Sequence, residues 1–123
     1  MIRRLIISIF IIVTIALSQS NYKSKGDLRL APKMLNYQGY LTDTLGNPIN
    51  NSTISMTFTI YDAVSAGNPK WTETQSTVNV SKGIFHVLLG SIAPIPDSVF
   101  TAGINRWLEL TIAGQILTPR TRI

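Results

Sequence analysis

The segment from Thr53 to Tyr61, TISMTFTIY, alternates strictly between hydroxyl-bearing and apolar side chains. Successive side chains of a β-strand point to opposite faces, so this order collects the apolar groups on one face. They are Ile54, Met56, Phe58 and Ile60. In a helix the same side chains would be scattered around the whole axis. The segment therefore predicts a half-buried β-strand, which we expect to be central in its sheet and protected from hydrogen exchange.

Further runs along the chain have the composition of strands and are separated by turn residues. They are Met34–Leu41, Lys70–Val80, Gly83–Gly90, Arg106–Gly114 and Gln115–Pro119. The run Gly83–Gly90 is mostly apolar, and we expect it to be buried on both faces. In Arg106–Gly114 the apolar side chains alternate with others, so one face is expected to point inward.

Clusters of glycine, asparagine and proline mark the turns between these runs: DTLGNP, SAGNP and SKG. The succession STVNV, SKG, IFHVLL predicts a β-hairpin over residues 76–89. The pair Ala113–Gly114 predicts a second hairpin that closes onto the last strand. The candidate helical turn is Ile95–Phe100, IPDSVF.

Six to seven short strands in about 90 residues predict an all-β fold, and specifically an antiparallel β-sandwich over residues 34–123. A small closed β-barrel is the structural alternative. The chain has no cysteine, so no disulfide contributes to its stability. Its apolar fraction of 45% must then supply the buried surface that holds the fold together.

The first twenty residues have the three regions of a secretory signal peptide. Arg3 and Arg4 precede the uncharged segment Leu5–Leu17, and the small residues Ser18–Ser20 follow it. We expect cleavage near Ser18–Ser20 and a secreted or cell-surface location. The alternative is an uncleaved membrane anchor, but 13 residues are short against the roughly 20 that span a bilayer as a helix. The polar, non-periodic residues 21–33 are expected to form a linker.

The positive charge of the chain belongs to its two ends. The whole chain has a formal net charge of +5. Between residues 34 and 119, however, three basic residues stand against five acidic ones, a net charge of −2. A nucleic-acid-binding protein needs basic residues clustered on a folded face. The sequence therefore excludes nucleic acid as the expected partner.

The residues that carry most enzyme chemistry are scarce and scattered. The single histidine, His86, lies inside a predicted strand, and no nucleophile or orienting carboxylate accompanies it in the sequence. No two of the six carboxylates lie within ten residues of each other. One histidine without cysteine cannot make a nitrogen and sulfur metal site. The sequence predicts no catalytic residue, no cofactor and no metal.

Calcium is the one metal for which the segment DTLGNPINN offers several oxygen atoms. The segment contains one carboxylate, Asp43, although calcium usually takes six to eight oxygens and several carboxylates. Aspartate and asparagine side chains also bond their own backbone in turns. We therefore expect the segment to turn the chain between two strands. The turn-forming residues are Asp43, Gly46, Asn47 and Pro48.

Aromatic side chains on the predicted strands offer a second possible site. Tyr61, Trp71 and Trp107 could project from the sheet and stack on sugar rings. Aromatic residues of β-sandwiches more often cover the core or a sheet edge. Glycan binding through these three residues is therefore kept as an alternative to a structural role.

The order of several motifs resembles a known module. NYQGYLTDTLGNPI, MTFTIYDA, WTETQSTVNVSKGIFHVLLGS, PDSVF, RWLELTIAG and LTPRTRI follow one another over residues 34–123. Together they resemble the N-terminal β module of secreted bacterial surface proteins of tail-fibre-like architecture. The resemblance implies no active site, possible envelope or surface partners, and oligomerisation through downstream regions. It also implies a stretch like SVPYA after the TPR motif, so the chain is expected to be a truncated form.

A weaker similarity links the first turn to transthyretin-like or carboxypeptidase-regulatory-like sandwiches. It rests on the pattern G-x-L-T-D-x-x-G-x-P-I between Gly39 and Ile49. We interpret the chain as a non-catalytic structural or docking module of a secreted bacterial surface protein. The alternatives are a carbohydrate-binding module and an accessory domain of a larger secreted hydrolase.

Overall fold

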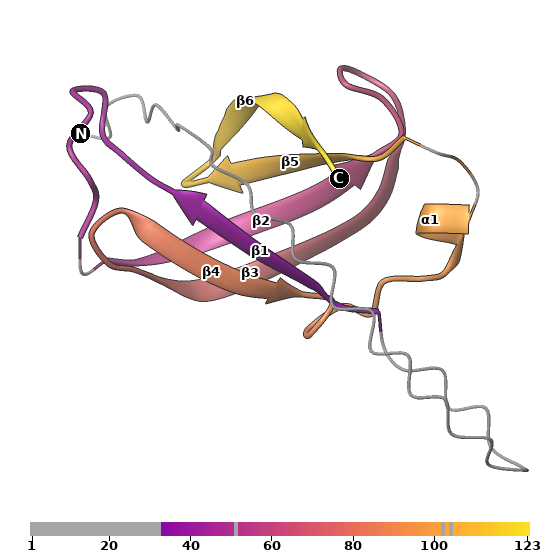
Figure 1. Cartoon of the computed structure of the whole chain (residues 1–123), viewed down its shortest axis with the longest axis horizontal. Coiled ribbons are helices and arrows are strands. Elements are labelled where there is room, and N and C mark those ends of the chain that lie inside the picture. The colour runs from indigo at the N-terminus through magenta and orange to yellow at the C-terminus, as the bar shows by residue number, and fades with distance from the viewer. Residues whose placement is uncertain (1–32, 51, 102, 104) are drawn as a thin grey trace, which may run out of the picture.

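The computed structural model describes residues 33–50, 52–101, 103 and 105–123 (Figure 1). The predicted signal peptide, 1–20, and all but the last residue of the predicted linker, 21–33, lie outside the described residues. The elements are β1 (Leu35–Tyr40), β2 (Ser52–Tyr61), β3 (Pro69–Val80), β4 (Ile84–Leu89), α1 (Ser98–Thr101), β5 (Trp107–Ile112) and β6 (Gln115–Arg122). Within the described part of the chain, no helix has the length and hydropathy that a membrane span requires.

The strands form two antiparallel sheets that pack face to face as a β-sandwich. The larger sheet has the order β3-β2-β5-β6, and β1 pairs with β4 in the smaller one. In Figure 1 the smaller sheet crosses in front of β2 and β3. The strand with the strictest alternation, β2, lies between β3 and β5, as its sequence predicts. The all-β sandwich is therefore confirmed, and the closed barrel is not formed.

The core lies between the two sheets and is built from the alternating apolar positions. Met56, Phe58 and Ile60 of β2 are each 0% exposed. From the smaller sheet, the Tyr37 ring meets Phe58 edge to face, with the ring centroids 5.8 Å apart. Gly39 faces the ring of Phe85, and a Cβ at position 39 would lie 2.4 Å from the Phe85 Cζ. A glycine is therefore needed where β1 passes over this ring.

The strand β4 differs from its sequence prediction. Ile84, His86 and Leu88 are exposed, whereas Phe85, Val87 and Leu89 are buried. The expected burial of both faces is therefore wrong. The reason is that the smaller sheet is covered on one face only, so a strand in it has one face exposed regardless of its apolar content.

The predicted hairpin over residues 76–89 forms only at its turn. Lys82 and Gly83 both have positive φ, of 51° and 80°, as a tight two-residue hairpin turn requires. One bridge follows, between Ser81 and Ile84. Beyond this bridge β4 leaves β3 and pairs with β1 in the other sheet. The residues of the turn predict its backbone conformation, but the strand with which β4 pairs depends on the packing of the whole fold.

The second predicted hairpin is confirmed. Ala113 and Gly114 have φ values of 50° and 76°, and they connect β5 directly to β6. The last strand runs beyond the predicted Pro119 to Arg122. The predicted helical turn is present as the short α1, which begins at Ser98, after the proline.

Candidate functional site

The turn after β1 is held by Asp43. Its Oδ1 accepts hydrogen bonds from the backbone amides of Leu45 and Asn47, both at 2.9 Å, and its Oδ2 accepts one from the Asn47 side chain at 3.3 Å. The backbone hydrogen bond from Asn47 is the main cause that lowers the pKa of Asp43. Gly46 takes a φ of 84°, and Pro48 bridges back to Thr42. Both carboxylate oxygens are thus used within the turn itself.

The asparagine that follows this turn is directed elsewhere. The Asn50 Oδ1 accepts a hydrogen bond of 2.8 Å from the backbone amide of Lys82. Asp43 and Asn50, two of the oxygen-bearing residues in the segment DTLGNPINN, therefore make two separate contacts, and Asn51 lies outside the described residues. In the part of the chain that the structure describes, no three acidic, histidine or cysteine side chains gather as metal ligands do.

Trp71, one of the predicted stacking residues, is a core residue. It is 8% exposed, and its Nε1 donates a 3.0 Å hydrogen bond to the Ala93 carbonyl. The surface position that sugar stacking needs is therefore not observed for this ring. In the first half of β3 the side chains of Trp71 and Glu73 alternate with exposed ones and point inward, and a register shift before Val78 changes this phase further along the strand.

Tyr61 and Trp107, the other two predicted stacking residues, do lie together. They are register partners on β2 and β5, and both are half-buried on the outer face of the larger sheet. The guanidinium of Arg120 lies 3.5 Å from the centroid of the Tyr61 ring. One face of the tyrosine is therefore occupied by a cation of the same chain, and Trp107 is the aromatic neighbour without this cover.

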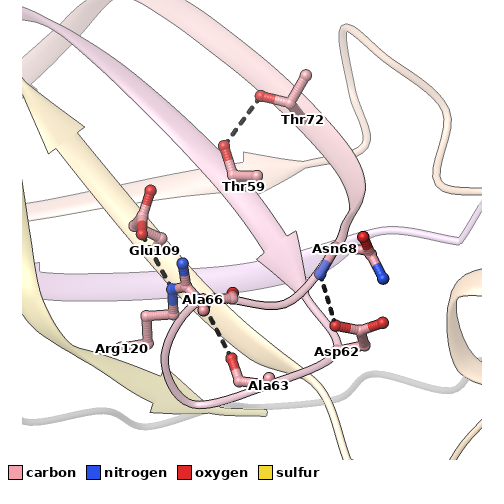
Figure 2. A network of polar contacts seen from close by, with 8 residues as sticks. All are labelled: Thr59, Asp62, Ala63, Ala66, Asn68, Thr72, Glu109 and Arg120. Atoms are coloured by element: carbon pink, nitrogen blue, oxygen red, sulfur yellow. Dashed lines mark hydrogen bonds and ion pairs between the residues drawn. The ribbon is translucent and has the colours of Figure 1, made fainter.

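Arg120 also fastens the loop between β2 and β3 (Figure 2). Its Nε donates to the Glu109 carboxylate at 2.9 Å, and its Nη1 donates to the carbonyls of Ala63 and Ala66 at 2.9 and 2.7 Å. The Arg120 and Glu109 side chains are only 10% and 11% exposed. A planar guanidinium can make these bonds together because its donors are fixed in a fork.

Replacing Arg120 by lysine is expected to destabilise the fold by about 1–3 kcal/mol, because an ammonium cannot reach the carboxylate and both carbonyls at once. Urea denaturation measures this change in the free energy of unfolding. Arg122→Lys is the matched control, since Arg122 is an exposed residue of the same strand and should change stability little. Equal effects of the two substitutions would refute the role of Arg120 in holding the loop.

The rest of the outer face of the larger sheet carries threonine pairs. The hydroxyls of Thr57 and Thr74 are 2.9 Å apart, and those of Thr59 and Thr72 are 3.1 Å apart. Each pair joins β2 to β3 at directly opposite positions. The hydroxyl row predicted for β2 thus forms cross-strand hydrogen bonds on a solvent-facing surface.

A buried carboxylate, Glu73, holds the segment after β4. Glu73 is 2% exposed, and its oxygens accept backbone hydrogen bonds from Gly90, Ile92 and Ala93, the shortest at 2.7 Å. The side chain of Gln75 adds another bond of 3.0 Å. Burial alone would raise the pKa of Glu73, but these hydrogen bonds outweigh it and lower the pKa. Amide donors surround the carboxylate and stabilise its negatively charged form.

Several other charged side chains of the described residues also have partners within the fold. Arg106 is 5% exposed, and it donates hydrogen bonds to the carbonyls of Val99 and Asn105, which ties α1 to β5. Asp62 accepts a bond of 2.8 Å from the Asn68 amide. Asp97 pairs with Lys33 at 2.8 Å on the surface. All five carboxylates of the described residues therefore have partners in the chain.

His86 lies on the exposed face of β4, where its register partner is Gln38 of β1. Its two neighbours on the same face of β4 are Ile84 and Leu88, and neither has a carboxylate. This environment is that of an ordinary surface residue of a strand.

Comparison with known proteins gives a family without an assigned activity. A family model described as a domain of unknown function, DUF8740, matches residues 36–120. No curated protein and no solved structure matches the chain. The match begins in β1, ends in β6 and includes the strands between them, and the chain belongs to this family.

Proposed function

We propose that this member of the DUF8740 family is a non-catalytic structural or docking module of a secreted bacterial surface protein. The proposal is carried by one observation: the carboxylates of the described residues are bonded to other groups of the same chain. In the described chain each carboxylate accepts bonds from loop amides or from a cation of the same chain. A catalytic acid or base must instead offer its oxygen to a substrate.

These contacts have a common mechanical effect, because each one fixes a loop to the sandwich. Glu73 fixes the segment after β4, Arg120 fixes the loop between β2 and β3, and Arg106 fixes α1. Loops that close over a substrate are drawn from the least stable parts of a protein. Loops fastened by buried charges favour a rigid module that presents a constant surface.

Carbohydrate binding is the second candidate, and the pairing of Tyr61 with Trp107 on a polar sheet face favours it. A glycan array probed with the full chain separates the two functions. The structural proposal predicts no saturable signal that depends on Trp107. Binding that is lost in Trp107→Ala, while the melting temperature of that variant stays close to wild type, would overturn the structural proposal in favour of glycan recognition.

The secreted location is proposed from the first twenty residues. Expression of the full chain in a bacterial host, followed by N-terminal sequencing of the exported protein, tests it. Cleavage after Ser18 or after Ser20 would leave Gln19 or Asn21 as the first residue. Recovery of the protein with Met1 intact and inside the cell would contradict the proposed location.

A further inference from the structure

The edge strands of the two sheets differ in the features that prevent pairing with other chains. Strand edges invite pairing with other chains, and proteins block them with charges, prolines and bulges. β6, at one edge of the larger sheet, carries Pro119, Arg120 and Arg122, and β3, at the other edge, begins with Pro69 and Lys70. The register of β3 on β2 is also shifted twice.

The edge of β1 has none of these devices. No charged residue and no proline occurs between Met34 and Thr42. The register of β1 on β4 runs without a shift from Leu35 to Tyr40. Among the residues that the structure describes, β1 pairs on one side only, with β4. An uncharged, regular strand is therefore left with one unguarded edge.

The hydrogen-bond phase shows which amides point to this edge. The Leu41 amide donates to the Gly83 carbonyl, so the residues that bond toward β4 are those in phase with Leu41. Leu88 of β4 is the register partner of Asn36. Its carbonyl accepts a hydrogen bond from the Gln75 side chain, which lies on the side of β4 away from β1, so it does not bond to Asn36. The backbone groups of every second residue of β1 thus face outward. They belong to Asn36, Gln38 and Tyr40.

We propose that β1 pairs with β1 of a second copy of this chain, antiparallel and about a two-fold axis at Gln38. The proposal deepens the proposed docking function and rests on it for its biological use. In this register Gln38 lies opposite Gln38 of the second copy, and Asn36 lies opposite its Tyr40. Every outward-facing residue then takes part in a hydrogen-bonded pair, which gives roughly six backbone hydrogen bonds and one continuous sheet of the order β4-β1-β1-β4.

The charges that flank β1 are complementary in the same register. Antiparallel pairing about Gln38 places Lys33 of one copy opposite Asp43 of the other, at both ends of the paired strands. Between these two residues there is no charge to repel. The present partner of Lys33 is Asp97, with both side chains about half exposed, so the lysine is held only by a weak surface pair. Charge complementarity therefore favours a second copy as the occupant of this edge.

Single cysteines test the register, because the native chain contains none. Hydrogen-bonded antiparallel partners have Cα atoms about 5.5 Å apart, within the range that a disulfide bridges. Gln38→Cys in the full chain is expected to give a covalent dimer under mild oxidation, detected by non-reducing electrophoresis and intact mass. Thr118→Cys, at an exposed position of the guarded strand β6, is the matched control and is expected to remain monomeric.

A second pair of variants distinguishes this register from random collision. Asn36→Cys and Tyr40→Cys should each cross-link poorly alone and well when mixed, because residue 36 of one copy faces residue 40 of the other. Circular dichroism confirms that each variant is folded. Cross-linking of Gln38→Cys no greater than that of Thr118→Cys would overturn the proposal, and so would equal cross-linking of Asn36→Cys alone and in the mixture. Either result leaves the proposed function standing, since the glycan array tests that separately.

Discussion

Replacing Glu73 by glutamine is expected to destabilise the sandwich by about 3 kcal/mol. The glutamine side chain keeps the shape of glutamate, but its amide group cannot accept the bonds that the lost oxygen accepted. The backbone amides of Gly90, Ile92 and Ala93 would then share one acceptor in a largely buried site. Urea denaturation of both proteins at pH 7 measures the loss in the free energy of unfolding.

Asp97→Asn is the matched control for this substitution. It also removes one negative charge, but Asp97 is exposed and its contact with Lys33 lies on the surface. A surface pair of this kind contributes between about 0 and 1 kcal/mol. If Glu73→Gln were no more destabilising than Asp97→Asn, the assigned role of the buried carboxylate would be refuted.

The stabilising effect of Glu73 should depend on pH in a defined direction. Its pKa is lower in the folded protein than the usual value of 4.5, because the hydrogen bonds to the carboxylate outweigh the effect of burial. A lowered pKa means that the unfolded chain binds the proton more readily. The stability difference between wild type and Glu73→Gln should therefore be complete above about pH 4.5 and shrink as the pH falls further. A difference that grows on acidification would contradict this assignment.

Replacing Trp71 by alanine is expected to cost about 3–5 kcal/mol, the range for removing a large aromatic side chain from a core. The ring is 8% exposed, and its Nε1 bond to Ala93 fixes the same segment that Glu73 holds. The free energy of unfolding in urea is again the measurement. Trp71→Phe should recover part of the loss, because it keeps a buried aromatic ring but lacks the hydrogen bond, which contributes about 1 kcal/mol, and leaves part of the indole volume unfilled.

The second tryptophan of the chain provides the comparison for Trp71. Trp107 is half-buried on the outer face of the larger sheet, so Trp107→Ala should destabilise the protein less than Trp71→Ala. A similar loss from both substitutions would show that the two rings are equally buried. That outcome would contradict the placement of Trp71 in the core and of Trp107 at the surface.

The strands of this fold could be predicted from the sequence because their signals are local. The alternation of Thr53–Tyr61 gives both the strand β2 and its buried face. The pairs Lys82–Gly83 and Ala113–Gly114 have the positive φ values that turn sequences of this type require. The positions of these elements along the chain therefore follow from side-chain period and turn chemistry alone.

The pairing of β4 could not be predicted in the same way. Its residues read equally well as the second strand of a hairpin with β3 and as a strand buried on both faces. The structure pairs it with β1 instead, and the partners lie between 44 (Tyr40 and Ile84) and 54 (Leu35 and Leu89) residues apart; Ile84 and Leu88 are exposed on one face. Such long-range partners are decided by the packing of the whole molecule.

The contacts of the buried charges could not be predicted from the sequence for a related reason. Glu73 lies two residues after Trp71 and therefore on the same face of β3, which is a readable sign of burial. Its partners, however, are backbone amides of a segment about twenty residues away, and these carry no sequence signature. Arg120 and Glu109 lie on adjacent strands of the second hairpin, but the loop carbonyls of Ala63 and Ala66 reach them only through the fold. Pattern alone thus identified the framework, and the contacts that rigidify its loops required the structure.

The buried charges of Glu73, Arg106 and Arg120 fasten the loops of the sandwich. Amide hydrogen exchange of the full chain, followed residue by residue by NMR, tests this claim most directly. It predicts that the amides of Gly90, Ile92 and Ala93 exchange as slowly as those of the central strand β2, and that Glu73→Gln accelerates them selectively. Rapid exchange of these loop amides in the wild-type protein, with β2 still protected, would contradict it.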